Sequence, residues 1–164
     1  MIFVCVGSRP YQFNRLFEEL DRLVGAGYVK DSLFAQIGAS TYEPKNFRFE
    51  HFMDPDAFKV KIAEADIVIS HGASGSIMGA LNAGKRVIAV SRLAKYGEHI
   101  NDHQVGINET LAAEGLVLAV REMDELGDAI EAMESGRVHL KPWHNPSPNA
   151  IIDEIDRFIQ EEVL

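Results

Sequence analysis

Short apolar runs alternate with segments of helical periodicity along most of the chain, and this alternation constrains the fold more than any other feature. The runs consist almost entirely of apolar residues, which is typical of strands buried on both faces of a parallel sheet. Between them, apolar residues recur at spacings of three and four, as in amphipathic helices. The sequence therefore predicts an α/β fold, Rossmann-like, with three α/β/α layers and a mostly parallel sheet.

The expected strands lie at 2–6, 33–37, 47–52, 67–69, 87–90 and 116–120. The expected helices cover 10–24, the region around 58–63, 75–83, 103–113 and 124–133. Asp54 or Asp56 is the expected cap of the second helix. These elements predict one domain over 1–141, followed by a proline-rich connector and a C-terminal helix in 142–164 that packs on the domain or on a partner.

The composition excludes some classes of partner. The chain has 164 residues and a formal net charge of -9, which argues against nucleic acid as the main partner because the phosphates would be repelled. Its single cysteine, Cys5, cannot form an internal disulfide. The apolar start is too short for a signal peptide, and no apolar run is long enough to span a bilayer. We therefore expect a cytoplasmic protein.

Ligands of such sheets collect at the carboxyl ends of the strands, and three strand ends are followed by polar or small residues. Gly7 follows the first strand and is either the edge of a site or a simple turn. Residues 70–76 follow the fourth strand, where small residues let the backbone approach a ligand. There the amides of Ser74, Gly75 and Ser76 are expected at a helix N-terminus, which favours a diphosphate, although a simple serine-capped helix has the same pattern.

Two known motifs are absent from this loop: the P-loop of nucleotide-binding proteins and the nucleophile elbow of ester hydrolases. Lys85 follows the predicted helix instead of opening it, so the loop is not a P-loop. The G-x-S-x-G pattern of a nucleophile elbow does not occur.

The third strand end is followed by the polar segment 91–104. Arg92 and Lys95 are candidates for contact with phosphate. Glu98, Asp102 and Gln104 are candidates for the hydroxyl groups of a sugar or ribose, because carboxylates accept hydrogen bonds. Asp102 taken alone also fits a helix N-cap.

Three histidines lie in these segments. His99 and His103 are four residues apart but straddle a predicted loop–helix boundary, and His71 lies in another segment, so metal binding is the less favoured interpretation. His71 and His99 are instead candidates for a general base.

The order of these motifs resembles the C-terminal, donor-binding domain of the family 28 GT-B glycosyltransferases. The resemblance is carried by the following segments: His71-Gly72-x-x-Gly75-Ser76, Gly84-Lys85, Arg92, Tyr96-Gly97-Glu98-His99 and Asp102-His103-Gln104. Val6-Gly7-Ser8, 13–16 and 36–38 are also similar to the family, so the likeness extends to about residue 120. It is strongest to stand-alone versions of the domain, such as bacterial exopolysaccharide "E-type" subunits and the small subunit of the eukaryotic dolichol-pathway UDP-GlcNAc transferase.

This resemblance implies a UDP-sugar donor, no metal and no further cofactor. It also implies a membrane-associated subunit that binds the acceptor and recruits the chain to the cytoplasmic face of the membrane. By the resemblance, Ser74, Gly75 and Ser76 hold the pyrophosphate, with His71 and Gly72 beside it, while Glu98, Asp102 and Gln104 hold ribose or the donor hexose. Many relatives carry Glu where this chain has Gly79.

The implied activity is transfer of a hexose from UDP to a lipid-linked or polysaccharide acceptor, with inversion at the anomeric carbon. A non-catalytic module that binds a nucleotide-sugar or stabilises a partner is the alternative. A nucleotide-sugar epimerase or hydrolase fragment fits less well, because those enzymes close two domains around their substrate. Self-association of the isolated chain is also expected to be possible, since a half-enzyme leaves an interface uncovered.

Overall fold

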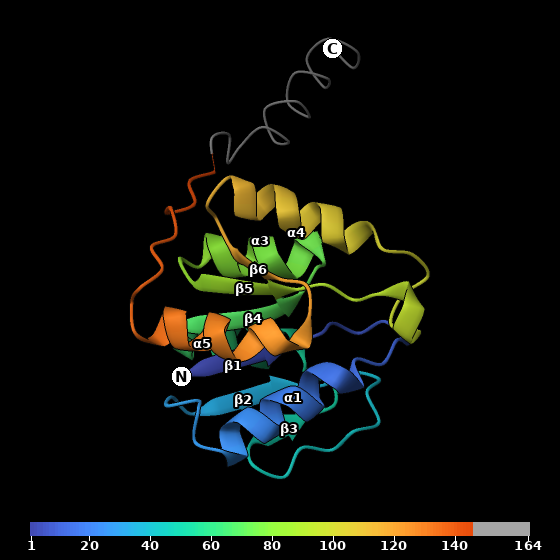
Figure 1. Cartoon of the computed structure of the whole chain (residues 1–164). Coiled ribbons are helices and arrows are strands. Elements are labelled where there is room, and N and C mark those ends of the chain that lie inside the picture. Colours follow the sequence, from blue (N-terminus) through green and yellow to red (C-terminus); the bar gives the residue numbers. More distant parts are fainter. Residues whose placement is uncertain (146–164) are drawn as a thin grey trace, which may run out of the picture.

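Six parallel strands form one sheet in the order β3-β2-β1-β4-β5-β6 (Figure 1). The structure is a computed structural model that describes residues 1–145. The strands are β1 (Ile2–Cys5), β2 (Leu33–Gln36), β3 (Arg48–Glu50), β4 (Ile67–His71), β5 (Arg86–Val90) and β6 (Leu118–Val120). The α-helices are α1 (Asn14–Gly25), α2 (Pro55–Glu64), α3 (Ser74–Asn82), α4 (His103–Ala113) and α5 (Leu126–Glu134). Two short 3-10 helices, η1 (Ala94–Tyr96) and η2 (Met123–Glu125), precede α4 and α5.

Two apolar clusters fill the spaces on either side of the sheet. Residues of α1 and α5 pack on one face against side chains such as Val4 and Ile69. Residues of α2 and α3 pack on the other face against Phe3 and Val68, and α4 adds Leu111 to this second cluster. The predicted Rossmann-like three-layer α/β/α fold is therefore confirmed. The strand order reverses direction between β1 and β4, which is where folds of this type bind ligands.

Each strand predicted from the sequence is present, and the helix predicted at 103–113 has those bounds. The predicted capping of α2 is also confirmed for Asp54, whose carboxylate accepts from the amides of Asp56 and Ala57. The last strand begins at Leu118 instead of residue 116, because the amide of Leu116 still bonds the carbonyl of Leu111 in the turn that ends α4. The helix expected at 124–133 is split into η2 and α5.

The first helix begins at Asn14, so the prediction that Pro10 opens it is wrong. The backbone before Asn14 bonds other elements instead of a helical turn. The amide of Phe13 donates to the Ser40 hydroxyl, and the carbonyl of Tyr11 accepts from the Arg92 guanidinium. Residues 7–13 therefore form a loop along the carboxyl edge of the sheet, where they can contact a ligand.

The segment after α5 runs back along the domain. Val138 and Leu140 pack against the first cluster, and Trp143 packs against the second. The Trp143 indole donates to the Asn82 side chain at the end of α3, 2.7 Å away. The connector is thus in contact with the domain as far as it is described. The predicted C-terminal helix lies outside the described residues, and the boundary after residue 141 stays a prediction.

Within residues 1–145, none of the helices is at once long enough and apolar enough to cross a membrane.

Candidate functional site

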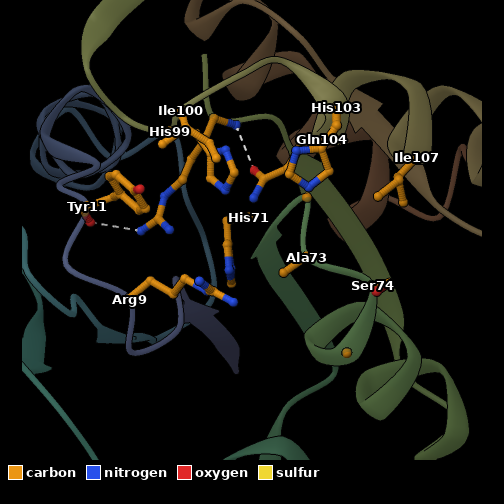
Figure 2. A pocket seen from close by; sticks show the side chains of 13 residues that line it. Arg9, Tyr11, His71, Ala73, Ser74, His99, Ile100, His103, Gln104 and Ile107 are labelled. Atoms are coloured by element: carbon orange, nitrogen blue, oxygen red, sulfur yellow. Dashed lines mark hydrogen bonds between the residues drawn. The ribbon is translucent and has the colours of Figure 1, made fainter. Parts of the chain in front are cut away.

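A cavity of about 410 Å³ opens at the carboxyl edge of the sheet, where β4 and the loop after β1 meet (Figure 2). Cavities of this volume are typical of small-molecule sites. Its walls come from the loop after β1, the β4–α3 loop, the segment after β5 and the start of α4. The lining residues are Arg9, Tyr11, His71, Gly72, Ala73, Ser74, Gly75, Arg92, His99, Ile100, His103, Gln104 and Ile107.

The N-terminus of α3 forms one wall of this cavity. The helix begins at Ser74 after Ala73, and no side chain caps its first turn. The amides of Ser74, Gly75 and Ser76 donate to no acceptor within residues 1–145, as expected for the first turn of an uncapped helix. Ser74 and Gly75 are exposed and line the cavity. This end of the helix therefore offers free N–H donors and the positive end of the helix dipole to an anion.

Close packing with α4 fixes the loop before this helix. A Cβ atom added at Gly72 would lie 2.6 Å from Cβ of Gln104 and 2.8 Å from Nδ2 of Asn108. Asn108 is itself buried and donates to the Ser91 hydroxyl at 2.9 Å. The absence of a side chain at position 72 therefore lets α4 lie directly against the β4–α3 loop.

Arg92 follows β5 and brings a buried positive charge to the wall of the same cavity. Its side chain is 1% exposed, and its guanidinium donates to the carbonyl of Tyr11 at 3.1 Å. The Nε atom has no acceptor in the described part of the chain. Burial lowers the pKa of Arg92 to about 10, against an opposing effect of Glu98. At neutral pH the group is still charged, and it forms no ion pair with a carboxylate of residues 1–145.

His71 ends β4 at the base of the cavity. Burial, with the nearby charge of Arg92, lowers its pKa to about 4. Its Nδ1 atom lies 3.3 Å from the carbonyl oxygen of Cys5, and this contact assigns the proton of the neutral ring to Nδ1. The Nε2 atom then carries a lone pair. His71 is thus held as a neutral imidazole whose free nitrogen can accept a proton or a hydrogen bond.

Gln36, at the end of β2, holds the loop on which His71 rests. Its side-chain oxygen accepts from the amides of Val6 and Gly7, and its nitrogen donates to the carbonyls of Gly7 and His51. Gly7 has a φ of +75°, and a Cβ there would lie 3.0 Å from the His71 ring. Gly7 therefore makes a tight turn under His71, and its own backbone groups are bound by Gln36.

The cavity brings together seven of the residues predicted from the sequence. These are His71, Gly72, Ser74, Gly75, Arg92, His99 and Gln104. Gln104 accepts from the amide of Arg92 at 3.2 Å, which leaves its side-chain nitrogen free of any acceptor among the described residues.

Five predicted residues do not line this cavity, and each has another position. Ser76 faces a separate small cavity beside α2. Lys95 is exposed and lies 3.4 Å from Glu122. The Glu98 carboxylate is buried, bonding Nε of Arg15 at 2.6 Å and the amide of Leu93 at 2.9 Å. Asp102 accepts from the amide of Ala94 at 2.7 Å and does not cap α4 with its side chain. Gly7 lies below His71.

The cavity also contains residues that were not predicted to be catalytic or donor-binding, chiefly Arg9, Tyr11, Ile100, His103 and Ile107. Tyr11 lies in the segment predicted as the first turn of a helix, and Arg9 precedes that segment. The signal that could have found Arg9 was its position directly after the first strand. Tyr11 packs on His99, which packs on His103, with ring centroids 5.2 and 4.7 Å apart.

Within residues 1–145, no group of three or more His, Cys, Asp or Glu side chains is placed to hold a metal ion.

Comparison with protein families gives one match that covers most of the chain. Residues 1–150 match the model of the glycosyltransferase family 28 C-terminal domain. Among curated proteins, the UDP-N-acetylglucosamine transferase subunit ALG13 of Homo sapiens is 32% identical over 125 residues, which is 70% of this chain and 10% of that protein. The Mus musculus subunit of the same name is 35% identical over 98 residues, 57% of this chain and 8% of that protein. The chain thus spans about a tenth of the length of these relatives.

Solved glycosyltransferase structures share the fold. The spinosyn forosaminyltransferase SpnP gives a TM-score of 0.63 at 17% identity, covering 97% of this chain and 44% of that chain. The solution structure of ALG13 gives 0.60 at 18% identity and covers 92% of this chain and 93% of that chain. The glycosyltransferase of kitacinnamycin gives 0.59 at 17% identity, with 98% of this chain and 39% of that chain covered. At these identities the likeness concerns the fold.

Proposed function

This chain belongs to the glycosyltransferase family 28 C-terminal domain family, and from that premise we propose that it is the donor-binding subunit of a UDP-sugar-dependent hexosyltransferase. The observation that carries the proposal is the uncapped N-terminus of α3, which opens into a cavity that Arg92 also lines. In this proposal the two phosphates of the donor lie between the Ser74 and Gly75 amides and the Arg92 guanidinium. The helix end contributes about half a positive charge, and the arginine adds a full one.

The same groups suit the chemistry of transfer. The acceptor hydroxyl oxygen forms a bond to the anomeric carbon, and the bond from that carbon to the phosphate oxygen breaks. UDP leaves with the electron pair, and its growing negative charge is stabilised by the helix amides and Arg92. Because these groups carry out the stabilisation, the proposed reaction needs no metal and no further cofactor. Attack from the face opposite to UDP would invert the anomeric centre.

A base must take the proton of the acceptor hydroxyl. His71 is the better placed of the two candidates, because its Nδ1 contact with Cys5 leaves Nε2 unprotonated. Its pKa of about 4 makes it a weak base in the empty cavity. A bound diphosphate would raise that pKa, since a nearby negative charge favours the protonated ring. His99, which is partly exposed at the same cavity, is the second candidate.

A partner that supplies the acceptor belongs to this proposal. The curated relatives are named as subunits, which supports an assembly of more than one chain. Ile100 lines the cavity and is 74% exposed, so an apolar side chain stands at its rim. We place a membrane-associated acceptor-binding subunit over this rim, and it recruits the chain to the cytoplasmic face of the membrane.

The proposal is tested by titrating the full chain with UDP and following binding by calorimetry. Gly75→Asp adds a carboxylate at the N-terminus of α3, where no atom lies within 4 Å of the new Cβ. The added charge favours the helix dipole but repels a diphosphate, so we expect unchanged or higher thermal stability and at least about a tenfold loss of UDP affinity.

Ser32→Asp is the matched control, because it adds the same charge to an exposed residue at the amino end of β2. It should leave UDP affinity unchanged. Failure of the wild-type chain to bind UDP at millimolar concentration would refute the proposal. If UDP binds but His71→Gln and His99→Gln both retain full transfer with the partner present, the chain binds the donor and the base belongs to the partner.

A further inference from the structure

Among residues 1–145, the side chains that line the cavity are cationic or neutral, and none of them is Asp or Glu. Two arginines line it, although the chain as a whole carries a formal net charge of -9. A local positive surface on an acidic protein concentrates an anionic ligand and repels a cationic one. The cavity is thus electrostatically opposite to the rest of the molecule.

The carboxylates that could bind neutral sugar hydroxyls are engaged elsewhere. Glu98 is 1% exposed and holds Arg15 and the amide of Leu93. Asp102 holds the amide of Ala94. Ionised carboxylates only accept hydrogen bonds, so they suit the hydroxyl groups of a sugar. Without them in the lining, the cavity has fewer groups that can accept a hydrogen bond from a sugar hydroxyl. The groups with free hydrogen-bonding capacity in the cavity are mainly donors.

One arginine that lines the cavity, Arg9, has no role in the proposed binding of the diphosphate. Glu98 neutralises Arg15, and Arg92 with the α3 N-terminus faces the two phosphates of the proposed donor. Arg9 is exposed, and its side chain makes no hydrogen bond or ion pair with any residue in 1–145. Figure 2 shows its side chain extending across the cavity toward His71. Its guanidinium is available to a second anionic group of the ligand.

We propose that the sugar of the donor is a hexuronic acid, whose C6 carboxylate is bound by Arg9. This inference rests on the proposed function and narrows its hexose to an acidic one. The planar guanidinium binds a carboxylate through two parallel N–H···O bonds, which a lysine cannot reproduce. A neutral hexose would leave Arg9 without a partner and would find few acceptors for its hydroxyls.

The test compares three ligands that differ in one feature at a time: UDP, UDP-glucose and UDP-glucuronic acid. Each is titrated calorimetrically into the wild-type full chain and into Arg9→Gln, which keeps a polar side chain and removes the charge. Arg48→Gln is the control, because Arg48 is an exposed arginine on the edge strand β3, away from the cavity. Circular dichroism checks that the variants are folded.

We expect the wild type to bind UDP-glucuronic acid at least about tenfold more tightly than UDP-glucose, the range of one charge-assisted contact. Arg9→Gln should abolish that preference and leave the affinities for UDP and UDP-glucose nearly unchanged. Arg9→Lys should restore only part of it, and Arg48→Gln should behave as the wild type.

Two results would overturn the inference while the proposed function stands. One is binding of UDP-glucose as tight as that of UDP-glucuronic acid. The other is an equal loss for all three ligands in Arg9→Gln, which would assign Arg9 to the diphosphate. Failure of the wild type to bind UDP itself would instead refute the proposed function, and this inference with it.

Discussion

A methyl group added at Gly72 should test how closely α4 packs against the β4–α3 loop. Gly72 directly follows β4, and the Cβ of an alanine there would lie 2.6 Å from Cβ of Gln104. That atom is fixed to the backbone of α4, so it cannot swing away as the end of a long side chain would. The backbone of Gly72 is not among those with positive φ, so the expected effect of Gly72→Ala is steric and not conformational.

Overpacking of this kind costs about 1 to 3 kcal/mol. For a domain of this size each kcal/mol shifts the melting temperature by roughly 2 to 4 °C, so Gly72→Ala should lower it by about 2 to 12 °C. The first turn of α4 must also move away from the β4–α3 loop. Because Gln104 and His103 lie on that turn and line the cavity, UDP affinity should fall as well.

Gly106→Ala is the matched control on the same helix. Gly106 is exposed in α4, and a Cβ there meets no atom within 4 Å. This substitution should raise stability by up to about 1 kcal/mol, because alanine favours a helix interior over glycine. Both variants are compared by thermal and urea unfolding. A Gly72→Ala protein as stable as the wild type would refute the close approach of α4 to this loop.

Two further predictions address the buried polar groups. Glu98→Gln should lower the free energy of unfolding by about 3 kcal/mol in urea denaturation, because it leaves the largely buried Arg15 uncompensated, whereas Glu109→Gln at an exposed ion pair should change it by less than about 0.5 kcal/mol. Equal effects of the two would contradict the structural role of Glu98. The pKa of His71 is lowered from 6.5 to about 4, so the unfolded chain binds more protons between these values and stability falls as the pH drops through this window. Between pH 7 and pH 5, this group should lower the free energy of unfolding by about 2 kcal/mol. The loss should be absent in His71→Gln and retained in the control His139→Gln. Identical pH profiles for the wild type and both variants would show that His71 is not held neutral.

The fold was predictable because its signal is local. Apolar strands, helical periodicity and turn residues follow each other along the chain, and each can be read without knowing the tertiary structure. The loop of small residues before α3 was predictable for the same reason, since its position after a strand places it at the carboxyl edge. The predicted helix start at Pro10 was wrong because of contacts that are distant in sequence. Arg92 and Ser40 bond the backbone groups that a helical turn would have paired with each other.

The roles of individual polar residues were less predictable, because they depend on distant partners. Glu98 was expected to bind sugar, but Arg15, 83 positions earlier, occupies it. Asp102 bonds a backbone amide eight positions earlier. Ser74 lines the cavity and Ser76 does not, because residues two apart in a helix point in different directions. Ser76 lies beside α2 instead. A sequence shows which groups can form hydrogen bonds, but it does not show which of them are already bonded to each other in the fold.

That pairing separates the groups that build the cavity from those that can bind a ligand. Gln36, Glu98 and Asp102 have their hydrogen bonds satisfied within the domain, and they fix the loops after β1 and β5. The donors at the start of α3 and on Arg9 have no acceptors in the described chain. Because the fixed groups include the carboxylates and the free groups are mainly donors, we expect the cavity to select a ligand by its charge more than by its hydroxyl pattern. A ligand with two separated anionic groups satisfies both sets of free donors, and one with a single anionic group satisfies only one of them.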